Sequence, residues 1–141
     1  MPAGFQRIND QKCDVLCKLA GKNGVTFRRF SPSLTNCYST FGAIVCMGGY
    51  NTLAETLFQG VPVVCVPRTK PRSEQFLRAL VFEQLGLLRT IKQDNLNPSN
   101  LSLAVNEALK TSRSRLQTRI NSLIKFDGAN QAANQIKNLR S

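Results

Sequence analysis

The chain has 141 residues, of which 42% are hydrophobic, and it carries 19 Lys and Arg residues against 8 Asp and Glu residues. This length suits one compact domain with one core and is too short for two full domains. The formal charge of +11 predicts attraction to polyanions, anionic lipid surfaces or phosphorylated small molecules.

Helical and extended patterns alternate along the chain. Strands are expected over 25–30, 43–47, 63–66 and 87–91. Helices are expected over 10–19, 31–38, 51–59, 73–85, 97–109, 113–125 and 128–139. This alternation predicts an α/β fold, with a mostly parallel sheet of about four strands flanked by helices. The predicted single domain has an N-terminal helical segment, an α/β core and C-terminal basic helices, over 1–24, 25–110 and 111–141.

Two glycines join the second predicted strand to the helix that follows it. Gly48 and Gly49 lack the Cβ atoms that block close approach, and the first turn of a helix has unpaired amides, so an anion can bind there. Asn51 and Thr52 carry side-chain oxygens that can cap the helix or hydrogen-bond a ligand. The alternative is an ordinary strand-to-helix turn that uses the glycines for its geometry. Glu55, taken alone, could also be the carboxylate of a capping box.

A second polar cluster follows the next buried strand. Gly60 ends the helix, and Pro67 ends the strand. Glu74 and Gln75 stand at the head of the following helix, after a loop with three basic residues, Arg68, Lys70 and Arg72. Ligands of open α/β sheets bind where the carboxyl ends of adjacent strands converge, so we expect the two clusters to form one site.

These residues, in this order, resemble a known family. The run from Gly48 to Glu55, followed by Gly60-Val61-Pro62, Pro67 and Glu74-Gln75, is similar to the donor-binding half of two-domain nucleotide-sugar glycosyltransferases of the family 28 type. The similarity extends from about Val25 to Leu109. It implies an incomplete Rossmann-like domain of the GT-B type. Such a domain binds a nucleotide sugar, here expected to be a UDP-sugar, and takes part in transfer of a hexosyl group to an acceptor hydroxyl.

The resemblance also implies roles for individual residues. In the family, the glycine turn and the helix start hold the diphosphate, which assigns this role to Gly48, Gly49, Asn51 and Thr52. The position of Glu55 binds the ribose, and a carboxylate can accept hydrogen bonds from both vicinal hydroxyls. The positions of Glu74 and Gln75 face the donor sugar. Candidates for phosphate contacts are Arg68, Lys70 and Arg72, for which the alternative is a solvated basic loop.

Parts of the family's architecture are missing from the chain. The family's donor domain begins with two more strand–helix units, and its acceptor domain normally supplies the catalytic base. Because the chain contains no histidine, a base must be a carboxylate or come from another chain. A truncated product, a half-enzyme with a partner chain and a rearranged small sheet all remain open. The isolated chain is expected to bind donor weakly and to show little or no turnover.

The five cysteines do not predict disulfides or a metal site. Their number is odd and their spacing is wide. Cys13 and Cys17 lie one helical turn apart, but no histidine or second close cysteine pair completes a zinc site. We therefore expect no metal and no cofactor, and we interpret Cys46 and Cys65 as small core residues.

The C-terminal segment is basic and amphipathic. Leu116, Ile120, Leu123 and Ile124 recur at helical spacing, which predicts a helix packed on the domain with its basic residues in water. Docking on an anionic membrane is the alternative, because the family's relatives act on lipid-linked acceptors. The sequence has neither a membrane-spanning apolar run nor an apolar signal core, so we expect a cytoplasmic protein that can sit peripherally at the inner face of the membrane.

Two other classes of function are suggested by parts of the sequence. The missing strands motivate a non-catalytic binding or assembly module that recruits a partner chain through the edge of its sheet. The charge alone suggests a nucleic-acid binder, but the sequence has no helix-turn-helix, zinc-finger or RNA-recognition signature. A nucleic-acid partner is therefore not expected.

Overall fold

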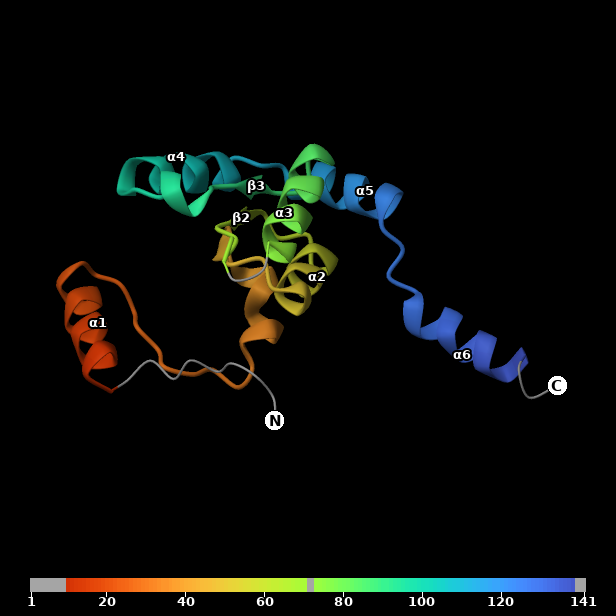
Figure 1. Cartoon of the computed structure of the whole chain (residues 1–141), viewed down its shortest axis with the longest axis horizontal. Helices are drawn as coiled ribbons and strands as arrows, with labels where there is room; N and C mark the ends of the chain where they lie inside the picture. The colour runs from red at the N-terminus through yellow and green to blue at the C-terminus, as the bar shows by residue number, and fades with distance from the viewer. Residues whose placement is uncertain (1–9, 71–72, 139–141) are drawn as a thin grey trace. The chain divides into compact units, whose positions relative to one another are not determined.

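A computed structural model describes residues 10–70 and 73–138 of the chain. The chain divides into two compact units, residues 1–34 and residues 35–141. The described part of the first unit contains helix α1 (Asp10–Lys22) (Figure 1), followed by irregular chain. Arg29 in this irregular part pairs with Asp14 of α1 at 3.0 Å.

The strand expected over 25–30 is wrong. These residues are irregular and belong to the first unit, whose described residues include no strand. An extended segment is stable as a strand only when a neighbouring strand pairs with its N–H and C=O groups. The alternating pattern of this stretch therefore does not produce a strand by itself.

The second unit contains a parallel sheet of three strands rather than about four. Strands β1 (Ile44–Cys46), β2 (Val63–Cys65) and β3 (Arg89–Thr90) pair in the order β1-β2-β3. Both pairs are parallel, with Ile44 opposite Val63 and Val64 opposite Arg89. The α/β class with a parallel sheet is as predicted, and the missing strand is the one expected over 25–30.

The predicted helices occur in the predicted order, with small shifts at their ends, and the short 3-10 helix η2 is an addition that was not predicted. The second unit contains η1 (Leu34–Thr40, of which Leu34 belongs to the first unit), α2 (Tyr50–Phe58), α3 (Glu74–Gln84), η2 (Gln93–Asn95), α4 (Pro98–Leu109), α5 (Arg113–Leu123) and α6 (Gly128–Asn138). Gly60 ends α2 with a left-handed φ of 63°, and the amide of Val61 donates to the carbonyl of Thr56. Among the described residues, no helix is long and apolar enough to cross a membrane.

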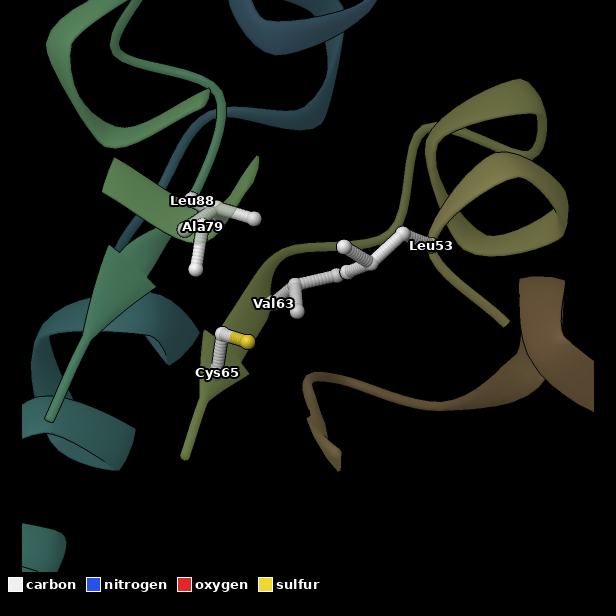
Figure 2. Packing of buried hydrophobic residues seen from close by; sticks show 5 residues of the cluster. All are labelled: Leu53, Val63, Cys65, Ala79 and Leu88. Atoms are coloured by element: carbon white, nitrogen blue, oxygen red, sulfur yellow. The ribbon is translucent and has the colours of Figure 1, made fainter. Parts of the chain in front are cut away.

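Helices cover both faces of the central strand. All three residues of β2 are buried, as expected for a strand between two helical layers. On one face, Val63 and Cys65 pack with side chains from α2, α3 and the chain before β3, namely Leu53, Ala79 and Leu88 (Figure 2). On the other face, Val64 packs with Val66, Ile91 and two alanines of α4, Ala104 and Ala108. Because successive side chains of a strand point to opposite faces of the sheet, β2 contributes to two separate hydrophobic clusters.

Helix α5 closes a third cluster against α2, as predicted for the amphipathic segment. Leu116 and Ile120 are buried with Leu57 and Leu87. The basic residues of α5 are not all simply solvated, however. Arg119 donates from Nε to the carbonyl of Leu85 at 2.6 Å, and Arg113 donates to the carbonyls of Ser39 and Phe41. The hydrogen bonds of these two arginines therefore also help to hold α5 against the rest of the second unit.

Candidate functional site

The candidate site is built around residues 47–49, here called the glycine bend, which join the carboxyl end of β1 to α2. Gly48 has φ of 76°, a left-handed conformation that favours glycine. Helix α2 begins at Tyr50 with Gly49 as its N-cap, and the amide of Leu53 makes the first helical bond to the carbonyl of Gly49 at 3.0 Å. The amides of the three residues before Leu53 therefore have no carbonyl partner within the helix.

This geometry removes the capping alternative. Because α2 already starts at Tyr50, Asn51, Thr52 and Glu55 lie inside the helix rather than at its cap. The N-cap residue, Gly49, has no side chain with which to satisfy the first amides. Among the described residues, no side chain caps the start of α2, so its first N–H groups and the positive end of its dipole are available.

The two glycines have different surroundings. A Cβ atom on Gly48 would lie 2.8 Å from Sγ of Cys65 and 3.7 Å from the backbone oxygen of Gln75. Gly48 is thus packed between the sheet and the head of α3. A Cβ atom on Gly49 would meet no heavy atom within 4 Å. Gly48 allows the chain to turn, and Gly49 leaves open space in front of the helix.

Glu55 lies one turn into α2 and is half-buried. Side chains of a helix tilt toward its N-terminus, so the Glu55 side chain is inclined toward the start of α2. The carboxylate also lies near the phenol of Tyr38 in η1: burial raises the pKa of Tyr38, and the negative charge of Glu55 raises it further. On the same side of α2, Gln59 bonds to both Ser39 and Thr35 of η1. Glu55 therefore lies on the side of α2 that faces η1.

Glu74 and Gln75 occupy the first turn of α3, next to the bend. The Glu74 side chain is 70% exposed. In contrast, Oε1 of Gln75 is buried and finds no hydrogen-bond partner among the described residues. An unpaired buried acceptor costs roughly 1–3 kcal/mol. A hydroxyl donor on a ligand would remove this cost if the Gln75 side chain turned toward it.

Arg78, which the sequence reasoning did not select, lies at the centre of this arrangement. Its Nη1 donates to the carbonyl of Gly48 at 3.3 Å, its Nη2 is ion-paired with Glu74, and its guanidinium lies 5.5 Å from the ring centroid of Tyr50. The spacing of Glu74 and Arg78 on a predicted helix was the available signal, because residues four apart share a helix face.

The basic loop between β2 and α3 is only partly described. Pro67 is buried, and Arg68 and Lys70 are exposed. Arg72, the third candidate for a phosphate contact, lies outside the described residues. The described part of the loop that joins the carboxyl end of β2 to α3 therefore presents two exposed cations.

Comparisons with known proteins decide the family. Residues 3–138 match the glycosyltransferase family 28 C-terminal domain, which is nearly the whole chain. The chain belongs to this family. The predicted resemblance is thereby confirmed, and membership places the chain among glycosyltransferases.

Curated relatives come from bacteria and from insect viruses. The family 28 domain is 30% identical over 100 residues to the UDP-N-acetylglucosamine--N-acetylmuramyl-(pentapeptide) pyrophosphoryl-undecaprenol N-acetylglucosamine transferase of Lactobacillus gasseri, covering 68% of this chain and 27% of the relative. It is 28% identical over 87 residues to the ecdysteroid UDP-glucosyltransferase of Autographa californica nuclear polyhedrosis virus, covering 62% of this chain and 17% of the relative. The chain thus spans about a quarter or less of these relatives.

A solved structure supports the fold. The glycotransferase of kitacinnamycin is similar with a TM-score of 0.58 and 25% sequence identity, over 70% of this chain and 26% of that one. The family 28 domain therefore shares its α/β architecture with part of a larger glycosyltransferase.

Two of the pockets in this family 28 domain are formed by different elements. One of about 280 Å³ is lined by Pro62 and Leu88, just before β2 and β3 begin. Another of about 360 Å³ lies between α2, α3 and the chain before α6, with Tyr50, Arg78 and Phe126 among its lining residues. The second includes no residue of the sheet or of the glycine bend, and it meets the candidate site through Tyr50 and Arg78.

Next to the glycine bend, two cysteine thiols lie on neighbouring strands and contact each other. Cys46 and Cys65 are register partners on β1 and β2. A hydrogen bond from Cys65 and one from the backbone of Gly48 hold the pKa of the Cys46 thiol below its usual value, although burial acts the other way. The pKa of Cys65 is raised by its bond to Cys46 and by burial. Of the two thiols, Cys46 is therefore the one that ionises at the lower pH.

Removing the donor should make Cys46 a weaker acid. We expect Cys65→Ala to move the midpoint of the pH–alkylation curve of Cys46 upward by about one pH unit, because the thiolate loses a hydrogen bond. Alkylation by iodoacetamide, followed by peptide mass spectrometry across pH 6–10, measures this midpoint. Cys17, which is exposed on α1, is the internal control. An unchanged midpoint for Cys46 would show that Cys65 does not stabilise its thiolate.

Proposed function

We propose that this chain is the nucleotide-sugar-binding part of a glycosyltransferase and that its donor is a UDP-sugar. The observation that carries the proposal is the uncapped N-terminus of α2 behind the open space at Gly49, with the Glu55 carboxylate one turn along. Unpaired amides and the helix dipole favour an anion, and a carboxylate favours hydroxyl donors. A nucleoside diphosphate presents both groups in this order.

The remaining roles follow from position. In the proposal, the diphosphate lies on the bend and the first turn of α2, formed by Gly48, Gly49, Asn51 and Thr52. Glu55 binds the ribose hydroxyls. Glu74 and Gln75 bind the donor sugar, for which the unpaired Oε1 of Gln75 is a supporting observation. Additional phosphate contacts come from the basic loop, through Arg68, Lys70 and Arg72.

The proposed chemistry is direct displacement at the anomeric carbon. An acceptor hydroxyl attacks this carbon, the bond to the diphosphate oxygen breaks, and the hydroxyl proton passes to a base. The amides at the start of α2 stabilise the charge that develops on the departing diphosphate. We propose that the acceptor-binding half and the base are supplied by a partner chain or by further residues of a longer protein, since the chain covers only 27% of its bacterial relative.

The acceptor class is also part of the proposal. The bacterial relative is named for an acceptor linked to undecaprenol through a pyrophosphoryl group. An anionic, lipid-linked acceptor is compatible with the formal charge of +11. The same charge supports peripheral placement at an anionic membrane surface.

Calorimetric titration with UDP, UMP and two UDP-sugars tests the proposal. We expect UDP to bind at least roughly tenfold more tightly than UMP, because the second phosphate gains the helix N-terminus, an interaction of about 1–2 kcal/mol in a partly buried site. The two UDP-sugars are UDP-N-acetylglucosamine and UDP-glucose. Equal affinities for UDP and UMP would mean that no diphosphate lies on the bend.

One observation favours a second candidate, a binding module that recruits a partner chain. Ile44 and Cys46 bond to the segment around β2, so the backbone groups of Val45 point away from β2. Val45 is 49% exposed, and within the described sheet β1 is an edge strand. Such an edge can accept another strand. A monodisperse monomer with a cooperative melt in analytical ultracentrifugation and calorimetry would count against this candidate.

A further inference from the structure

One side chain connects the three parts of the candidate site. Arg78 comes from the second turn of α3, and its side chain is only 20% exposed. It contacts the carbonyl of Gly48 in the glycine bend, the carboxylate of Glu74 at the head of α3, and the ring of Tyr50 at the start of α2. Two helix starts and the bend between them are therefore joined through a single guanidinium.

We propose that Arg78 is a positioning and specificity-determining residue of the donor site. It holds the glycine bend in its left-handed turn and fixes the Glu74 carboxylate at the sugar end. This inference rests on the proposed function, because it assigns Arg78 to the same site. It goes further in predicting that recognition of the sugar depends on a residue that need not touch the sugar.

Arginine is suited to this role by its shape. Its planar guanidinium carries five N–H donors in a fixed fork, so it can bond to a carbonyl and a carboxylate at once and stack on an aromatic ring. Lysine carries the same charge as a single ammonium group without that fork. The charge alone would therefore not reproduce the contacts of Arg78.

The contact with Glu74 has a direct consequence for specificity. The Glu74 side chain is 70% exposed and would otherwise sample several rotamers in water. Its pairing with Arg78 restricts the carboxylate before a ligand arrives, which lowers the entropy lost on binding. A nucleotide without a donor sugar, such as UDP, gains nothing from this restriction. The affinity for a UDP-sugar should therefore depend on Arg78 more strongly than the affinity for UDP.

The contact with Gly48 has a separate consequence for local stability. The amide of Leu53 donates to Gly49 at 3.0 Å, which is the first bond of α2 and adjoins the bend. If Arg78 holds the bend, its removal should allow this bond to open more often. The amide of Leu101, which donates to Asn97 at 3.0 Å as the first bond of α4, is a matched reference away from Arg78.

The test compares Arg78→Ala, Arg78→Lys and the control Arg89→Ala in the full chain. Arg89 forms a comparable ion pair with Glu107 at 2.8 Å, on β3 and α4. Affinities for UDP, UDP-N-acetylglucosamine and UDP-glucose are measured by calorimetry. Exchange of the Leu53 and Leu101 amides is measured by nuclear magnetic resonance.

For Arg78→Ala we expect UDP to bind roughly threefold more weakly than to wild type, because charged hydrogen bonds are lost. Of the two UDP-sugars, the one that wild type binds more tightly should lose roughly tenfold or more in affinity. Exchange at Leu53 should be at least about fivefold faster, with Leu101 unchanged, because only local opening is affected. Arg78→Lys should resemble Arg78→Ala, and Arg89→Ala should resemble wild type. In Glu74→Gln, further removal of Arg78 should no longer change the preference for UDP-sugar over UDP.

Two results would overturn the proposal. One is an Arg78→Ala variant whose ratio of UDP-sugar to UDP affinity and whose Leu53 exchange match those of Arg89→Ala. The other is full rescue by Arg78→Lys, which would show that charge rather than positioning matters. If wild type binds no nucleotide, the proposed function fails, and the sugar-specificity role of Arg78 fails with it. Exchange at Leu53 then still decides whether Arg78 holds the bend.

Discussion

Glu55→Ala is expected to weaken UDP binding by roughly 10–100-fold. A carboxylate that accepts hydrogen bonds from ribose hydroxyls contributes about 1.5–3 kcal/mol, and each 1.4 kcal/mol corresponds to about a tenfold change in the dissociation constant. Glu55 is half-buried on α2, one turn from the glycine bend. Water screens a half-buried carboxylate less than an exposed one, so part of this free energy contributes to binding. Calorimetric titration of UDP into both proteins measures the difference.

Deoxynucleotides turn this prediction into a test of the ribose contact itself. Wild type should prefer UDP to 2′-deoxy-UDP, and Glu55→Ala should lose that preference, because the carboxylate and the hydroxyl are the two partners of one interaction. Glu107→Ala is a suitable control, since Glu107 lies on α4 and pairs with Arg89. If Glu55→Ala kept the wild-type preference for UDP, the ribose would have to lie elsewhere.

Gly48→Ala is expected to destabilise the second unit by about 2–5 kcal/mol. A non-glycine residue at a left-handed φ costs about 1–2 kcal/mol, and overpacking a tight site adds about 1–3 kcal/mol. Both apply, because Gly48 has φ of 76° and an added Cβ would lie 2.8 Å from Sγ of Cys65. Since domains of this size have total stabilities of only about 5–15 kcal/mol, the loss should be plain in chemical denaturation.

Gly49→Ala provides the matched comparison one residue along. Gly49 has φ of −58°, and an added Cβ meets no heavy atom within 4 Å, so the cost should be about 1 kcal/mol or less. Adding Cys65→Ala to Gly48→Ala should restore the stability lost through the steric overlap but not the stability lost through backbone strain. Equal denaturation midpoints for the two glycine variants would contradict the distinction between a packed and an open glycine.

Much of the second unit could be predicted from the sequence because its signals are local. Short apolar runs bounded by glycine and proline correctly predicted β1 and β2, and Gly60 marked the end of α2. The strand expected over 25–30 shows the limit of such signals. Its pattern is that of a strand, but strand formation needs a neighbour, and the described chain around it provides none.

The candidate site divides in the same way. Gly48, Gly49, Glu55, Glu74 and Gln75 could be selected because residue type and spacing relative to strand ends are visible in the sequence. Arg78 could not be selected from the sequence, since an exposed Glu–Arg pair on a helix is common and contributes little to stability. Its importance depends on the carbonyl of Gly48, thirty positions earlier in the chain.

From the amino-acid order alone came the succession of strands and helices, the parallel sheet and the family resemblance, because periodicity, glycine and proline act over a few neighbouring residues. Three features needed the folded chain: the burial of Gly48 against Cys65, the open space at Gly49 and the guanidinium that joins α3 to the bend. Each is a contact between distant segments, and close packing in three dimensions decides which atoms meet.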